Sequence, residues 1–442
     1  MNVFTNVTGL KRTIGVFGLA CAVVNITVGT GIFVLPALVA EHMGAAAIIC
    51  FFLCGLLIFL IGLCFAEVGS KVTGSGGTYT YIETAFGPFF GFLANNIFWF
   101  GSGVLSDAAV ANGLSKTLGS FFPFVDSSAF RPIFFLFLFG GLALINIRST
   151  NNGVKFVIYT TLAKLFPLFL LISFGLSHIS IANLQWTDSF TIHDVGATSL
   201  ILFFAFLGIE TVVSNSGEIK NPSRVIPLGI LSGISVVLLL YVSIQLISQG
   251  ILGHNLVTYK DAPLSEVSKR LFGYIGISLV SIGIVISMLG NLSGEILAIP
   301  RVIFAGARNG IFPAILGKVH PTYFTPYISI AIYATMGYFL SVFGTLKQLL
   351  VLSSASTLLI YLGVVFATMR LRYKSPSSTE KAFTIPGGLL VPILATMGIL
   401  WLLSNLSKEE MIGTTIALLV LSLIYFFMKW FKKKQLMNPI QQ

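Results

Sequence analysis

The chain is built around a succession of apolar segments, each about 20 residues long, that are separated by short polar joints. Hydrophobic residues make up 55% of the sequence and charged residues 9%, so a soluble domain of this composition would leave large apolar surfaces in water. Segments of this length cross a bilayer as helices, in which every backbone polar group is paired within the segment. The sequence therefore predicts an all-α integral membrane protein.

We place about twelve membrane-spanning helices along the chain. A single membrane domain, 14–428, is expected between a cytoplasmic N-terminal arm, 1–13, and a cytoplasmic tail, 429–442. With the N-terminus inside, most lysines and arginines fall in inner loops, which fits a protein of the cell membrane with both termini in the cytoplasm. The predicted spans lie near 14–38, 43–67, 87–117, 131–147, 153–177, 195–217, 226–250, 272–298, 326–344, 347–369, 386–405 and 411–428.

The first predicted span has a helix-breaking centre, Val28-Gly29-Thr30-Gly31-Ile32-Phe33-Val34-Leu35-Pro36. In lipid a broken helix is tolerated only where the freed backbone faces protein or a water-filled cavity, so the break predicts a binding site. The second half-helix would direct unpaired N–H groups and a positive dipole end at an anion. Alternatively, Gly29 and Gly31 let another helix pack closely, as small residues do in many membrane bundles.

The sixth predicted span carries a second interruption, at Gly208, two residues before Glu210. If spans one to five and six to ten are inverted copies, the two interruptions occupy corresponding positions. Paired interrupted spans are the best sequence indication of a transporter's substrate site.

Several separated motifs occur in order along the chain: Val28-Gly29-Thr30-Gly31-Ile32-Phe33, the loop 66–88, the run 203–227 and the run 301–326. Together they resemble the amino acid–polyamine–organocation (APC) family of amino acid permeases. The resemblance implies a LeuT-type fold of two inverted five-helix repeats, about 14–177 and 195–369, with discontinuous helices one and six and two additional helices at 386–428. It also implies alternating access around a central amino acid. Thr73 departs from the family, which often has proline there.

By this resemblance, the carboxylate of the substrate would bind the backbone N–H groups around Thr30 and Gly31, with Gly29 in the same backbone clamp. Its ammonium group would meet backbone carbonyls freed by the unwinding, at Ile26 in span one. A zwitterion fits such a site on physical grounds, because one side offers a positive half-helix end and the other offers unpaired carbonyl oxygens.

In span six the resemblance assigns the remaining ammonium contacts to the carbonyls of Phe204, Ala205 and Leu207. Phe204 corresponds to an aromatic residue that covers the substrate as an occluding gate in relatives. The alternative is that Phe204 is one more lipid-facing or core phenylalanine among the 40 in the chain.

Two ionisable residues are candidates for gating and coupling, because an idle charge inside a membrane is costly. Lys164 matches a family lysine that takes the place of the sodium ion used by sodium-coupled transporters of the same fold. It would be either a structural pin on span-one carbonyls or a proton carrier. Glu210 aligns with an acidic position linked to gating, and its alternative role is a stabilising hydrogen bond across the break.

Asp107 in span three and Glu295 in span eight fall near positions that line the side-chain pocket in relatives. Two carboxylates there would suit a cationic side chain such as that of lysine, arginine or ornithine. Alternatively they pair with Lys164 or with each other, or one is a protonated relay. Glu67, Glu218 and Arg301 lie at inner span ends and are expected to form gate or loop salt bridges.

The sequence predicts a sodium-independent secondary transporter that moves an amino acid by proton-coupled symport or by exchange. The alternative within this class is a cationic amino acid or polyamine antiporter, and the alternative from another class is a channel or receptor-like module. We expect no enzyme, no catalytic residues, no metal site and no cofactor, since neither a clustered nucleophile nor a His pair at metal-ligand spacing occurs. The expected partners are the amino acid, the lipid bilayer and, for symport, coupling protons, and the scattered basic residues exclude nucleic acid. The sequence carries no signature of the oligomeric state.

Overall fold

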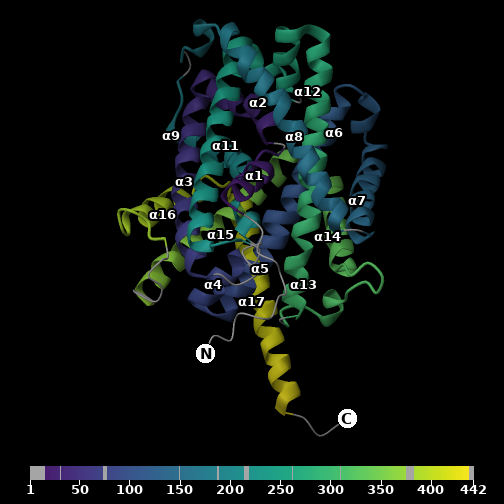
Figure 1. The fold of residues 1–442 in the computed structure, drawn as a ribbon, viewed down its shortest axis with the longest axis vertical. Coiled ribbons are helices and arrows are strands. Elements are labelled where there is room, and N and C mark those ends of the chain that lie inside the picture. The colour runs from purple at the N-terminus through teal and green to yellow at the C-terminus, as the bar shows by residue number, and fades with distance from the viewer. Residues whose placement is uncertain are drawn as a thin grey trace.

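The computed structural model describes residues 15–29, 31–72, 77–148, 150–186, 189–213, 219–260, 262–308, 310–374 and 383–437. Within these ranges the chain folds into helices and contains no β-strand, which confirms the all-α prediction. Figure 1 shows the helices as one bundle with α1 near its middle. We call the end of the bundle that carries α4, α5 and α13 the α4 end.

The first part of the chain begins with a helix that is interrupted near residue 29 and continues through a π-helical segment in the third predicted span. Its elements are α1 (Val16–Thr27), α2 (Gly31–Met43), α3 (Ala47–Lys71), α4 (Thr78–Phe86), α5 (Pro88–Asn96), the π-helix η2 (Ile97–Val104), α6 (Leu105–Gly119), α7 (Arg131–Arg148) and α8 (Thr150–Gly175).

The second part also begins with an interrupted helix, and it ends with two helices that follow α15. Its elements are α9 (Ile192–Phe203), the 3-10 turn η6 (Phe204–Phe206), α10 (Ile209–Val212), α11 (Pro222–Leu252), η8 (Gly253–Thr258), α12 (Pro263–Ala298), α13 (Pro300–Arg308), α14 (Tyr327–Phe343), α15 (Leu346–Lys374), α16 (Leu390–Leu403) and α17 (Lys408–Met437).

Seven helical stretches among the described residues are long and apolar enough to cross a membrane. Shorter apolar helices accompany them at Val16–Thr27, Leu162–His178, Tyr327–Phe343 and Leu390–Leu403. The long stretches are Gly31–Lys71, Arg131–Arg148, Ile192–Val212, Pro222–Thr258, Pro263–Arg308, Leu346–Tyr373 and Lys408–Trp430.

The outer surface of the bundle is apolar. Phe137 on α7, Leu239 on α11 and Leu423 on α17 keep 74%, 71% and 69% of their surface exposed. Exposed side chains of this kind on several helices would aggregate in water and are stable in hydrocarbon. The structure thus has the surface of an integral membrane protein.

Some boundaries differ from the predicted ones. Two short helices, α4 and α13, form in segments that the prediction leaves between spans, after 43–67 and after 272–298. The range of α12 includes a short helical part that begins at Pro263 and ends at a kink at Gly273, whose φ is 64°. The long apolar part follows the kink, close to the predicted start near residue 272. α17 continues to Met437, so the first part of the predicted cytoplasmic tail is helical.

Candidate substrate site at two helix breaks

The break between α1 and α2 leaves the last carbonyls of α1 without helical partners. The final helical bond of α1 runs from Val28 N to Val24 O, at 2.9 Å, and Gly29 N then turns back to Thr27 O, at 2.8 Å. A helix terminus in a membrane must find other donors for its last four carbonyls. Here these donors come from three neighbouring helices.

Lys164 on α8 provides two of these bonds. Its ammonium nitrogen lies 2.5 Å from Asn25 O and 2.8 Å from Val28 O, and the side chain is 1% exposed. The cation therefore lies at the negative end of the α1 dipole, where a positive charge is favourable. The structure brings Lys164 to the break in span one, as the sequence led us to expect.

Polar side chains of α12 and α11 satisfy the two intervening carbonyls. Asn291 Nδ2 donates to Ile26 O at 3.1 Å. The Tyr241 hydroxyl lies 2.8 Å from both Thr27 O and Ala205 O, and with a single proton it donates to one of them at a time. Tyr241 thus links the end of α1 to η6, the first turn of the second break.

The second break lies between η6 and α10. Gly208 has φ of 129°, a conformation open to glycine, and a Cβ there would lie 2.7 Å from Ile26 Cγ2. The Gly208 N–H donates to Glu210 Oε2 at 3.0 Å, and the Tyr361 hydroxyl of α15 donates to the same oxygen. Glu210 therefore caps its own short helix across the break.

The two breaks face each other. A Cβ on Gly31, the first residue of α2, would lie 2.7 Å from Ala205 Cβ and 2.8 Å from Ala205 Cα. Gly31 therefore lets the two interrupted helices approach, as the packing alternative proposed, and it also borders the cavity described below.

A cavity lies between the breaks and leaves about 30 Å³ for the centres of water-sized molecules. A single water needs about 10–15 Å³ by this measure, so the lining must move apart to admit an amino acid. The charged side chains of the lining are Glu210 and Glu295. The full lining is Ile26, Thr27, Gly29, Gly31, Ser102, Ser106, Val110, Phe204, Leu207, Gly208, Glu210, Asn291 and Glu295.

The structure brings most of the predicted site residues to this cavity. Ala205 and Lys164 lie behind the lining and hold the breaks through the contacts given above. Asp107 is not in the lining, and Thr30 lies outside the described residues. The predicted residues in the lining are Ile26, Gly29, Gly31, Phe204, Leu207, Glu210 and Glu295.

Asp107 is buried beside the cavity, with 0% of its surface exposed. Its Oδ2 accepts a hydrogen bond from the Tyr333 hydroxyl of α14 at 2.9 Å, and within the described part of the chain its Oδ1 has no partner. Ser106, its neighbour, lines the cavity instead.

Residue selection from the sequence missed the buried tyrosines and Asn291. Tyr241 and Tyr361 are each 0% exposed, and a phenol inside an apolar span needs a partner for its hydroxyl. Asn291 precedes Glu295 by four residues, so the two share one face of α12. These two signals could have identified all three residues.

We expect Tyr361→Phe to lower the stability of the protein by about 1–3 kcal/mol, because Glu210 loses a buried donor while the ring keeps its packing. Unfolding in detergent, followed by heat or denaturant, measures this loss. Tyr338→Phe, on α14, is the matched control and should change stability little. Equal effects of the two substitutions would contradict a specific role for the Tyr361 hydroxyl.

The described residues contain no group of three or more His, Cys, Asp and Glu side chains that could hold a metal ion. The four cysteines of the chain are free thiols, and Cys21 is the exposed one. The polar groups at and behind the cavity are thus helix termini, the carboxylates of Glu210 and Glu295, and the buried Lys164.

Comparison with known proteins agrees with this architecture. Residues 14–437 match the family model described as amino acid permease. The chain is 30% identical to the serine/threonine exchanger SteT of Bacillus subtilis (strain 168), over 94% of this chain and 96% of the relative.

Two further relatives come from the same organism. The methylthioribose transporter is 28% identical, over 97% of this chain and 95% of the relative. The branched-chain amino acid permease BcaP is 27% identical, over 94% and 93%.

Proposed function

Because the chain belongs to the amino acid permease family, we propose that it is a secondary transporter that carries an amino acid by alternating access. The observation that carries this proposal is the cavity between two facing helix breaks. The N-terminus of α2 at Gly31 offers backbone donors for a carboxylate. Phe204, the first residue of η6, and Leu207, which follows η6, offer carbonyls for an ammonium group.

The carbonyls at Ile26 and Ala205 already have protein donors, Asn291 and Tyr241. A carbonyl oxygen has two lone pairs, so Ile26 O in the lining can accept a second bond from a substrate ammonium group, and Ala205 O can do so once the lining moves apart. Phe204, at 6% exposure in the cavity wall, is the proposed gate that moves aside.

We propose twelve crossings arranged as two inverted five-helix repeats, 14–177 and 195–369, followed by α16 and α17. Two packing relationships support the repeat. α8 packs along α12, which pairs the fifth span with the eighth, and α6 packs along α15, which pairs the third with the tenth. In two five-helix repeats, span five corresponds to span ten and span three to span eight. The pair of spans five and eight therefore corresponds to the pair of spans ten and three, as an inverted repeat requires.

The transport cycle is proposed to be sodium-independent and to run by exchange or by proton-coupled symport. Lys164 supports independence from sodium, because its ammonium already occupies two carbonyls at the break in α1. The similarity to a serine/threonine exchanger supports exchange. The α4 end is proposed to face the cytoplasm, since it carries the basic residues Lys71, Arg308 and Arg372.

A second candidate is a cationic amino acid or polyamine antiporter. The observation in its favour is the charge of the lining, in which Glu210 and Glu295 are the ionisable side chains. Glu210 is bonded to Gly208 and Tyr361, so Glu295 is the residue that would meet a cationic side chain.

Counterflow into proteoliposomes tests both candidates. We expect an internal amino acid to drive saturable accumulation of external labelled substrate in a panel of neutral and cationic amino acids and polyamines. Imposed sodium gradients should have no effect. Absence of counterflow over the whole panel would refute a carrier, and stimulation by sodium alone would refute the role given to Lys164.

If Glu295 selects a cationic side chain, Glu295→Gln should weaken the apparent affinity for cationic substrates by about tenfold or more and leave the affinity for neutral ones within about twofold. Competition by unlabelled substrates in the counterflow assay measures this difference. An equal loss for both classes would assign Glu295 to the structure of the cavity instead.

A further inference from the structure

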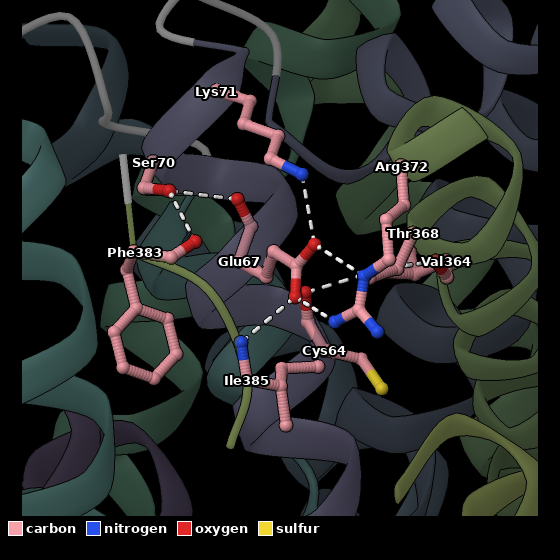
Figure 2. Close-up of polar contacts among 9 residues, drawn as sticks. All are labelled: Cys64, Glu67, Ser70, Lys71, Val364, Thr368, Arg372, Phe383 and Ile385. Carbon is pink, nitrogen blue, oxygen red and sulfur yellow. Dashed lines mark hydrogen bonds and ion pairs between the residues drawn. The ribbon is translucent and has the colours of Figure 1, made fainter. Parts of the chain in front are cut away.

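Glu67 is a buried carboxylate outside the cavity, near the end of α3 (Figure 2). Its Oε1 accepts from Lys71 Nζ at 2.8 Å and from Arg372 Nε at 3.0 Å. Its Oε2 accepts from the Ile385 backbone N–H at 2.9 Å and from Arg372 Nη2. Four donors fill the accepting capacity of a carboxylate, and the Glu67 side chain is 0% exposed. We call Glu67, Lys71, Arg372 and Ile385 the Glu67 cluster.

The Glu67 cluster joins three segments that are distant in the sequence. Lys71 belongs to α3, Arg372 to α15, and Ile385 to the non-helical segment that precedes α16. The side chains of Lys71 and Arg372 are 21% and 18% exposed, so the cluster lies where the buried interior meets the α4 end. Loss of Arg372 would strongly destabilise the folded protein, because the cost of burying the charged Glu67 carboxylate would no longer be compensated.

Helix α15 continues from this cluster to the cavity. One turn above Arg372, the Thr368 hydroxyl lies 3.2 Å from Cys64 O on α3. Higher still, the Tyr361 ring stacks edge to face on Phe65, with 5.4 Å between centroids, and its hydroxyl reaches Glu210. The same face of α15 therefore contacts α3 at the α4 end and the second helix break at the cavity.

The bond between Glu67 and Arg372 also spans two packed groups of helices. α3 packs on α11 and α9, and α11 packs on α1, which carries the first break. α15 packs on α6 and η2, which provide the opposite wall of the cavity. A motion that separates the two groups at the α4 end must break this bond.

We propose that Glu67 is a positioning residue that holds α15 against α3, keeps Tyr361 on Glu210, and releases Arg372 when the α4 end of the transport path opens. The inference rests on the proposed alternating-access cycle, because the cluster acts on a path that opens and closes. Glu67 itself does not touch the substrate.

Native Cys64 is the probe for this opening. Figure 2 shows it on α3 beside the cluster, and its side chain is buried, with 0% exposure. With Cys21, Cys50 and Cys54 replaced by serine, Cys64 is the single thiol of the full-length chain. The rate at which a water-soluble maleimide modifies it in proteoliposomes then reports how often the α4 end separates.

We expect Glu67→Gln and Arg372→Gln each to accelerate modification of Cys64 by about tenfold or more. The double variant should be no faster than the faster single variant, because both substitutions break one interaction. Glu41→Gln is the matched control, since it removes an exposed ion pair between Glu41 on α2 and Lys260 in the turn after η8, away from the α4 end. It should leave the rate unchanged.

The transport readout separates positioning from simple stabilisation. If Glu67→Gln populates the form open at the α4 end, the KM for substrate on the opposite side should rise several-fold, while the maximal rate falls less. Arg372→Lys, which keeps the charge and loses the two-point contact, should give an intermediate change even if Glu67→Gln does not fold.

Modification of Cys64 at the control rate in both Glu67→Gln and Arg372→Gln would overturn the proposal, as would additive effects in the double variant. The maleimide assay needs no substrate. A wild-type protein without counterflow would thus refute the proposed function, while the rates at Cys64 would still test whether Glu67 holds α15 on α3.

Discussion

Lys164→Ala is expected to abolish uptake driven by a pH gradient. The substitution removes the donor to Asn25 O and Val28 O, and leaves Asn25 O without that buried donor and Val28 O with only the long contact of the Ser287 hydroxyl, at 3.5 Å. Each buried acceptor left unsatisfied costs about 1–3 kcal/mol, which is enough to change the conformation of the break. Initial rates of labelled amino acid uptake into proteoliposomes with an imposed pH gradient measure the effect.

A comparison of uptake with exchange distinguishes the two roles considered for Lys164. If Lys164 is a structural pin, Lys164→Ala loses exchange and pH-driven uptake together. If it carries the proton, exchange persists, because exchange needs no net proton movement. Lys408→Ala, at the exposed start of α17, is the control. Unchanged pH-driven uptake in Lys164→Ala would contradict both roles.

Gly31→Val is expected to eliminate substrate binding. A Cβ at this position would approach Ala205 Cα to 2.8 Å, so the branched side chain must push the two interrupted helices apart. It would also crowd the N–H groups at the start of α2, where the carboxylate is proposed to bind. Overpacking of this kind costs about 1–3 kcal/mol. Equilibrium binding of a substrate identified by counterflow, together with thermal unfolding, measures both effects.

Gly140→Ala on α7 is the matched glycine control, because a Cβ there meets nothing within 4 Å. It should leave binding at the wild-type value and should not lower stability, since alanine is favoured over glycine in a helix by about 0.5–1 kcal/mol. Gly31→Val with retained affinity would assign Gly31 to helix packing alone, while loss of binding with wild-type stability would favour direct crowding of the site.

The sequence predicted the helix breaks well, because each has a local cause. Gly29 and Gly208 interrupt apolar runs whose backbone must otherwise stay helical in lipid, so glycine there is itself the signal. Lys164 and Glu210 were found for a similar reason, since a charge inside an apolar span needs a partner. Both are at the breaks in the structure.

Tyr241 and Asn291 could have been singled out as polar residues inside apolar spans, but the groups to which they bond could not be predicted. Tyr241 and Asn291 bond to backbone carbonyls of α1, and a carbonyl acceptor leaves no mark in the sequence of either helix. The sequence also did not show which residues of α6 face the cavity. The π-helix η2 precedes it and changes the register of the residues that follow, so Ser106 lines the cavity while Asp107 bonds to Tyr333.

The central claim is that the transported amino acid binds between the two breaks. Ser106→Cys introduces a thiol of nearly the same size into the cavity wall, in a chain whose four native cysteines are replaced by serine. An amino acid that supports counterflow is expected to protect this thiol from a small maleimide, with half-maximal protection near its own KM. Full reactivity of the thiol at saturating substrate would contradict the claim.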